Sequence, residues 1–295
     1  MSLASAMSTG ISGLGMNAEA ISVVGNNISN TNTAGFKGAR TVFSDLLSAT
    51  ISGGQVGRGG RIQTVQNLFS QGSFENTQSV SDLAIQGNSF FALAAPSTAA
   101  ATNQNDAYLT RAGSFLADNN YNLVNPDGYA VLEAATGLPI KFAHVDGATA
   151  GDFSKITGID TKGVITYLDV FGNSFFYTGN GVAVSTATSA TYAAASATGA
   201  IAIVNPVNTN GLTKVGGTLF KCGAASGVPA VAPTAATNSA NGTSEIINSS
   251  SLEISNVDMA TELVNLIKLQ RAYSGNSKTI TTADQMMQET LQLKQ

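Results

Sequence analysis

The stretch from Leu252 to Lys294 constrains the fold of this chain most, because it contains no proline and a single glycine, Gly275. Its apolar residues recur every three or four positions, which predicts one long helix. Ser255 or Asn256 is expected to cap the start of that helix, since both side chains can accept a hydrogen bond from a free backbone N–H. A helix of roughly 38 residues would be about 57 Å long, more than a small domain is wide. We therefore expect it to project and to need a partner.

Polar residues interrupt the apolar side of this predicted helix. Gln270, Ser274 and Ser277 share a face with the apolar positions, so the apolar seam is broken. The residues that we expect to carry the contacts of the helix are Val257, Leu263, Val264, Ile267, Gln270, Arg271, Tyr273, Ile280, Met287 and Leu291.

Residues 2–30 predict a second amphipathic helix. Its apolar positions alternate four and three apart, with gaps at Gly10 and Asn17. Only Glu19 is charged, whereas a helix on a solvated surface normally carries more charge. We therefore expect it to be surrounded by helices and to pair with the C-terminal one, within the chain or between copies. The residues expected on its contact stripe are Leu3, Met7, Leu14, Ile21, Val24 and Ile28.

An asparagine-rich run, GNNISNTNTAGFK, follows this first helix at residues 25–37. Asparagine side chains bond to their own backbone and tolerate the left-handed region, so the run predicts the end of the helix and a turn. Gly35 adds further turn potential.

The run and its C-terminal counterpart together carry a family resemblance. The sequence resembles the flagellar hook and basal-body rod family, in which GNNIxNxxTxGFK follows the first helix. The matching residues here are Asn26, Asn27, Asn30, Gly35, Phe36 and Lys37. The C-terminal counterparts are Ser255 to Asp258, Glu262 to Val264, and Gln270 to Tyr273. Two motifs at opposite ends, in the expected order, make the resemblance specific.

Short apolar runs with turn residues between them occupy about residues 81–178. The runs at 83–85, 90–93, 108–110, 114–116, 129–132 and 164–167 are the expected strands. Many short strands at this spacing favour an antiparallel sandwich or barrel. The expected fold class is therefore α+β, with the terminal helices paired as a coiled-coil-like rod and a discontinuous all-β domain between them. The expected domains are 1–32 with 255–295, a connector at 33–80, and a β-rich domain at 81–254 with little or no inserted outer domain.

The connector is expected to hold a short helical turn around Val42 to Leu47 and a flexible bend at Gly53 to Gly60. The glycines around Arg58 lack the Lys-Ser/Thr that follows in a phosphate-binding loop. We therefore interpret residues 57–61 as a small basic loop.

No catalytic, cofactor or metal site is expected. His144 is the only histidine and has no partners at the spacing of a catalytic triad or a zinc site. The aspartates recur near turns, where they bond locally. Cys222 is the only cysteine and is interpreted as a small buried apolar residue. A net charge of -4 gives no electrostatic case for nucleic acid, and no apolar run is long enough to span a membrane.

The resemblance implies a structural subunit that self-assembles as a helical tube and is exported without a cleaved signal. Its implied partners are further copies, rod, hook-cap and hook–filament junction proteins, and the flagellar export apparatus. The opening segment favours the hook, and the short span at Lys141 to Phe153 favours the distal rod. We place the hook first and the distal rod second. A secreted β-rich adhesin is the more remote alternative, and it predicts a monomer that keeps its ligand affinity without the terminal helices.

Overall fold

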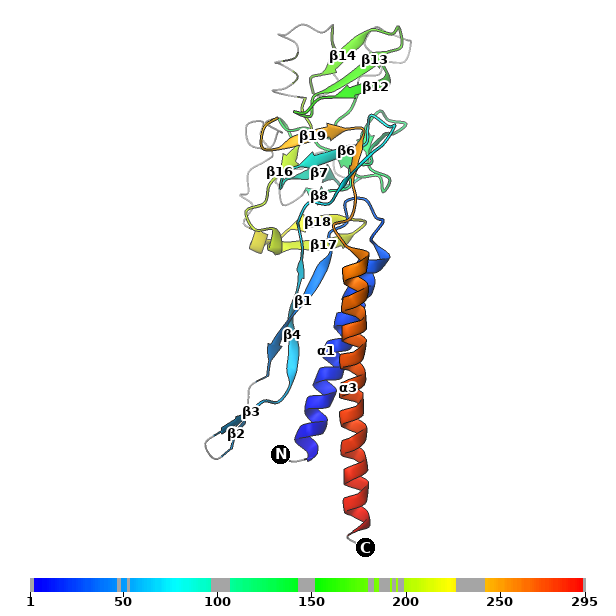
Figure 1. Cartoon of the computed structure of the whole chain (residues 1–295). Coiled ribbons are helices and arrows are strands. Elements are labelled where there is room, and N and C mark those ends of the chain that lie inside the picture. Colours follow the sequence, from blue (N-terminus) through cyan, green and yellow to red (C-terminus); the bar gives the residue numbers. More distant parts are fainter. Residues whose placement is uncertain are drawn as a thin grey trace. The chain divides into compact units, whose positions relative to one another are not determined.

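The chain is an α+β protein, as predicted, with one long helix near each end of the sequence and mostly antiparallel strands in the sequence between them (Figure 1). The computed structural model describes residues 3–46, 49–51, 54–96, 107–142, 152–179, 183–185, 192, 195, 199–226 and 242–293. The chain divides into two compact units. The helical unit comprises Met1–Asn32, Lys37–Leu68 and Val257–Gln295, and the β unit comprises Thr33–Phe36 and Phe69–Asn256. The predicted connector is thus shared between the two units.

Both predicted helices are present in the helical unit. Helix α1 spans Leu3–Ser29 and helix α3 spans Met259–Gln292. The predicted cap of α3 was wrong, because Asp258 is the N-cap and its side chain accepts hydrogen bonds from the backbone N–H groups of Ala260 and Thr261. A carboxylate at this position also interacts favourably with the helix dipole.

Helices α1 and α3 pack against each other through small residues of α1 (Figure 1). A Cβ atom at Gly10 would lie 2.8 Å from Cγ1 of Ile280, and one at Gly13 would lie 2.4 Å from Nδ2 of Asn276. The glycine and asparagine that interrupt the predicted stripe therefore mark the contact itself. The buried positions of α1 are Gly10, Gly13, Asn17, Ala20, Val24 and Asn27.

The predicted helical turn in the connector was also wrong. Strand β1 (Ala39–Asp45) pairs antiparallel with β4 (Gly60–Asn67), with an irregularity between Val42 and Phe43. The apolar residues there are spaced as in a helix, but the run is rich in the β-branched and aromatic types that favour strands. Two short strands, β2 (Ala49–Ile51) and β3 (Gly54–Val56), pair beyond this hairpin.

An eight-stranded antiparallel sheet forms the largest part of the β unit, in the order β17-β18-β8-β7-β11-β10-β9, with β16 also paired to β7. Its strands are β7 (Phe90–Ala94), β8 (Tyr108–Thr110), β9 (Leu116–Ala117), β10 (Leu123–Val124), β11 (Ala130–Val131), β16 (Ile203–Val204), β17 (Leu212–Gly216) and β18 (Leu219–Cys222).

A second sheet has the order β12-β13-β14-β15, and two strand pairs, β19–β6 and β20–β5, complete the unit. These strands are β5 (Phe74–Asn76), β6 (Leu83–Gln86), β12 (Phe153–Ile159), β13 (Ile165–Asp169), β14 (Ser174–Tyr177), β15 (Ala183–Ser185), β19 (Ile246–Ser249) and β20 (Ser251–Glu253). The six predicted strands correspond to β6, β7, β8, β9, β11 and β13, whereas other strands, including β10, β12 and β14, were missed.

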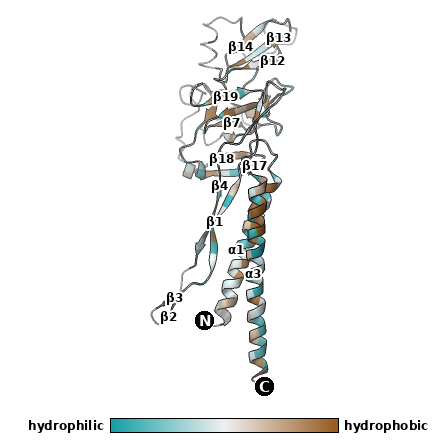
Figure 2. Cartoon of the chain, in the orientation of Figure 1, coloured by the Kyte–Doolittle hydropathy of each residue, from teal (hydrophilic) through white to brown (hydrophobic). Residues whose placement is uncertain are grey.

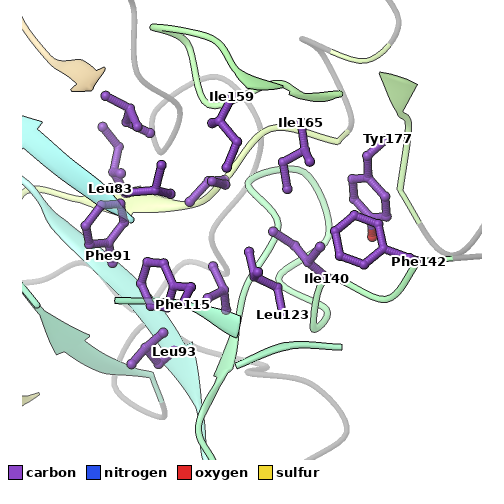
Figure 3. Close-up of a cluster of buried hydrophobic side chains, with 14 of the residues drawn as sticks. Leu83, Phe91, Leu93, Phe115, Leu123, Ile140, Phe142, Ile159, Ile165 and Tyr177 are labelled. Carbon is purple, nitrogen blue, oxygen red and sulfur yellow. The ribbon is translucent and has the colours of Figure 1, made fainter. Parts of the chain in front are cut away.

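One apolar cluster joins the two larger sheets (Figure 3). Phe91, Leu93 and Leu123 of the eight-stranded sheet share it with Ile165 and Tyr177 of the four-stranded sheet. Cys222 is buried in a neighbouring cluster, as predicted. His144 and the adjacent Asp146 lie outside the described residues.

Turn aspartates of the β unit bond locally, as predicted. Oδ1 of Asp118 accepts hydrogen bonds from the backbone N–H groups of Asn120 and Asn122, at 2.8 and 2.7 Å. Oδ1 of Asp169 accepts from those of Phe171 and Asn173, at 2.9 and 2.7 Å.

Candidate functional site

The side chain of Asn27 joins three elements of the helical unit. It lies near the end of α1 and is 1% exposed. Its Nδ2 donates to the carbonyl oxygen of Ala39 at 2.8 Å, and its Oδ1 accepts from the N–H of Ala39 at 3.0 Å. Nδ2 also lies 3.3 Å from Oε1 of Glu262 on α3. The amide thus completes the backbone hydrogen bonds at the start of β1 and links that strand to both helices.

The other asparagines of the run end α1. Nδ2 of Asn30 donates to the carbonyl oxygen of Asn26 at 2.9 Å and to its Oδ1 at 3.0 Å. The N–H of Asn30 bonds to the carbonyl oxygen of Asn26 at 3.2 Å. These bonds satisfy carbonyl groups that the last turn of a helix leaves free.

Gly35 and Phe36 lie in the β unit. Gly35 has a φ of +68°, and a Cβ there would lie 2.2 Å from the backbone nitrogen of Ala112. Its N–H donates to the carbonyl oxygen of Glu253 at 2.7 Å. Only glycine fits a left-handed position at such a close backbone approach. Phe36 is 9% exposed, and the Nζ of Lys214 lies 4.9 Å from the centre of its ring.

A buried ion pair holds the segments that meet at this point. Arg111 and Glu253 are 1% and 0% exposed, and Nη1 of the arginine lies 3.2 Å from Oε2 of the glutamate. Oε1 of Glu253 accepts from the N–H of Gly72 at 2.8 Å, and Nη2 of Arg111 donates to the carbonyl oxygen of Gly87 at 2.7 Å. Burial lowers the pKa of Arg111, while the charge and hydrogen bond of Glu253 oppose that shift.

Sequence reasoning did not select this pair as a site. Arg111 directly follows the expected strand at 108–110, and a lone arginine beside a strand of apolar residues is the signal that could have found it. Glu253 gives no comparable signal, because its neighbours do not show that it is buried. The pair ties together residues that are far apart in the sequence, so it stabilises the fold of the β unit.

The predicted contact residues of α1 lie beside its most buried face. Met7, Leu14, Ile21 and Ile28 are half-buried, and Val24 is 9% exposed. Leu3 is the first residue of the helix. The predicted stripe therefore borders the α3 contact, whose centre is formed by the smaller residues.

Most of the predicted contact residues of α3 are exposed in this chain. Leu263, Val264 and Ile267 are 44%, 50% and 51% exposed. Tyr273 and Leu291 are also exposed, as are the polar Gln270 and Arg271. Val257, Ile280 and Met287 are half-buried. Hydrophobic residues are visible along the first turns of α3 in Figure 2.

Several large apolar side chains in the first turns of α3 are thus exposed in this chain. We define the α3 outer face as Met259, Leu263, Val264 and Ile267. The residues of α3 that turn toward α1 instead include Leu266, Leu269 and Ala283, which sequence spacing did not select.

A groove of about 260 Å³ lies among α1, β1 and α3, with Val24, Ala39, Glu262 and Leu269 in its lining. Across the described ranges, histidine, cysteine, aspartate and glutamate form no group of three or more that could hold a metal ion. None of the helices in the described part of the chain is both long and apolar enough to cross a membrane.

Three family models match the chain in order. Residues 7–37 match the flagella basal body rod protein model, and residues 84–167 match the D1 domain of the flagellar hook protein FlgE/F/G. Residues 248–293 match the C-terminal model of the flagellar basal body rod FlgEFG proteins. The three matched segments contain Asn27, Arg111 and α3, in that order.

Individual relatives belong to the same group of flagellar proteins. The flagellar basal-body rod protein FlgG of Bacillus subtilis is 33% identical over 97% of this chain and 97% of its own. FlgG of Caulobacter vibrioides is 33% identical over 98% and 99%. The flagellar hook protein FlgE of Brucella abortus is 39% identical over 52% of this chain and 41% of its own. With its helices, connector motif and C-terminal motif all matched, the chain belongs to the family of flagellar hook and basal-body rod proteins, which are structural components of the flagellum.

Proposed function

We propose that this chain is a subunit of the flagellar basal-body rod. The observation that carries the proposal is the extent of the alignments. The rod protein of Bacillus subtilis aligns with this chain over 97% of its own length, whereas the hook protein of Brucella abortus aligns over only 41% of its own length. The alignment leaves more than half of that hook protein without a counterpart in this chain. The expectation that placed the hook first is therefore reversed.

Self-assembly is supported by apolar surface on the helical unit. The α3 outer face, Ile11 on α1 and Phe43 and Val65 on the hairpin are all more than 40% exposed. Contacts between unlike faces of successive copies do not close on themselves and so build a filament or tube. In this proposal the helical unit lines the inner tube and the β unit forms the outer wall.

The proposed partners are further copies of the chain, the adjoining rod and hook proteins, and the flagellar export apparatus. The role is structural, and the proposal assigns the chain no catalysis and no cofactor. In a strain without a working export apparatus, the chain should stay inside the cell, whereas recovery outside such cells would overturn this route.

Labelling of purified hook–basal bodies tests rod against hook. Antibody against the chain, detected with gold, should label the straight rod and leave the curved hook unlabelled. Deletion of the chain should stop the structure before any hook forms, because the hook is built on the completed rod. Label along the hook, or a deletion strain with a complete rod and no hook, would assign the chain to the hook instead.

A further inference from the structure

The α3 outer face has no cover within the described part of the chain. Leu263 and Ile267 lie four residues apart, so they stand one above the other on one side of the helix. Met259 extends the same line, and Val264 lies beside it. All four are at least 44% exposed. Apolar surface in contact with water is unfavourable, so an occupant on this face would be stabilising.

The exposed side of α1, its outward face, carries mostly small residues, in contrast to the large apolar residues of the α3 outer face. Ile11, Gly15, Ala18 and Ser22 follow one another at intervals of three and four, and all are exposed. A Cβ at Gly15 would meet nothing within 4 Å, and the same holds for Gly25. The chain's own packing therefore does not need these two glycines, in contrast to Gly10 and Gly13.

Glycine is, after proline, the least favourable residue inside a helix. A helix with two open glycines is therefore less stable alone than it would be with alanines, and their presence is explained by a contact outside the chain. A helix from another copy can approach the backbone closely at Gly15, as α3 does at Gly10 and Gly13 of the same chain.

We propose that the outward face of α1 receives the α3 outer face of a second copy; this inference rests on the proposed rod function. The large side chains of Leu263 and Ile267 then lie against the backbone at Gly15 and Ala18. The contact continues the α1–α3 pairing from one chain to the next, so each α1 lies between two α3 helices.

Charge supports the same pairing. Glu19 is the only charged residue of α1 and lies beside the outward face. Lys268 and Arg271 follow the apolar residues of the α3 outer face and are both exposed. When Leu263 lies against Gly15 and Ile267 against Ala18, Lys268 and Arg271 of one copy lie within about one turn of Glu19 of the other, where opposite charges attract.

Gly15 gives a test with opposite effects on folding and on assembly. Gly15→Ala should raise the melting temperature of the helical signal in the isolated chain, because the added Cβ meets no atom. Gly15→Leu should leave the isolated chain folded but reduce its incorporation into basal bodies several-fold. Gly10→Leu is the matched control, which should lower both folding and incorporation because Ile280 occupies that space. Normal incorporation of Gly15→Leu would overturn the inference.

Cross-linking identifies the occupant. Cells express one copy with Gly15→Cys and one with Ile267→Cys, and a short bis-maleimide is added to purified basal bodies. A cross-linked dimer should require both variants. A control pair replaces Ile267→Cys by Val65→Cys, an exposed apolar position on the hairpin. A chain without new cysteines corrects for Cys222, which is buried.

The outcomes separate this inference from the function itself. A dimer with Ile267→Cys supports the proposed contact, whereas a dimer only with Val65→Cys identifies the hairpin as the occupant and overturns it. Incorporation without any cross-link at Gly15→Cys overturns it as well, while the rod function stands. If the unmodified chain is absent from basal bodies, the proposed function fails first.

Discussion

The guanidinium of Arg111 and the carboxylate of Glu253 form an ion pair at 3.2 Å, with both side chains fully buried. The two residues are 142 positions apart in the sequence. Loss of one partner leaves the other charge buried and unpaired, which costs about 3–5 kcal/mol. Arg111→Met should therefore lower the free energy of unfolding of the β unit by about that amount. Every tyrosine except Tyr273 belongs to that unit, so tyrosine fluorescence in a urea titration measures it.

The double variant Arg111→Met, Glu253→Leu is the control for this pair. It removes both charges, so it should be more stable than Arg111→Met alone although the N–H of Gly72 loses its acceptor. A cost for Arg111→Met near that of an exposed substitution, about 0.5 kcal/mol, would contradict the structural role.

Removal of the Asn27 side chain, which bonds to Ala39 and Glu262, should lower the stability of the helical unit. Asn27→Ala leaves the buried N–H and carbonyl oxygen of Ala39 without partners, at a cost on the order of 3 kcal/mol. Asn27→Asp keeps an acceptor for that N–H but places a carboxylate near Glu262, so this variant should regain stability in acid. The far-UV signal of the helices measures both, and Asn26→Ala, at an exposed position, should change little. Equal stability of the Asn26→Ala and Asn27→Ala variants would contradict this role of Asn27.

Gly35 and Gly172 separate backbone strain from steric clash. Both have positive φ, +68° and +85°, but a Cβ at Gly35 would lie 2.2 Å from a backbone nitrogen and one at Gly172 would meet nothing. Gly172→Ala should cost about 1 kcal/mol from its conformation alone. Gly35→Ala should cost several times as much, since the backbone at Ala112 must also move. Tyrosine fluorescence during urea unfolding compares the two, and equal costs would show that the loop at Gly35 shifts freely.

The parts of the fold that the sequence predicts are those set by local periodicity. Both helices and the strands around Phe90 and Leu109 carry regular apolar spacing, and these appear where expected. The hairpin at Ala39–Asp45 was missed because its spacing of apolar residues also fits a helical turn. Its register depends on pairing with Gly60–Asn67, which local propensity does not encode.

The contact face of α1 was harder to predict for a different reason. Apolar spacing predicted Leu14 and Ile21 as the contact residues, whereas the buried residues are Gly13 and Asn17. At Gly13 the absence of a side chain lets α3 come close. A glycine gives no hydrophobic signal, and its role is set by the partner. The asparagine run and Gly35 predict the turn locally, but nothing local distinguishes the buried Asn27 from the exposed Asn26, so Asn27 was selected through the family resemblance.

The N-cap Asp258 predicts that the stability of α3 depends on pH. Hydrogen bonds from Thr261, through its side chain and then its backbone, together with the N–H of Ala260, lower the pKa of Asp258 below its ordinary value of 3.8. The folded chain thus releases this proton more readily than the unfolded chain. The cap's contribution is present above pH 3.8 and is lost as pH falls through the lowered folded value. Asp258→Asn keeps the cap without a titrating group, so comparison of its helical melting with that of the wild type isolates this carboxyl. Identical pH profiles would contradict the assignment.

Leu263 and Leu266 lie three residues apart on α3 but differ in burial, and they give the sharpest comparison of folding with assembly. Leu263 is 44% exposed, whereas Leu266 is half-buried on the side toward α1. Leu263→Asp should keep the helical signal and its melting temperature but prevent incorporation into basal bodies, because an aspartate in an apolar contact between copies has no partner. Leu266→Asp places the same charge between α1 and α3, so it should lower the melting temperature in the isolated chain. Circular dichroism and the yield of the chain in purified basal bodies measure the two effects. Normal incorporation of Leu263→Asp would remove the α3 outer face from the assembly contacts, and unfolding by Leu263→Asp would show that the face is covered within the chain.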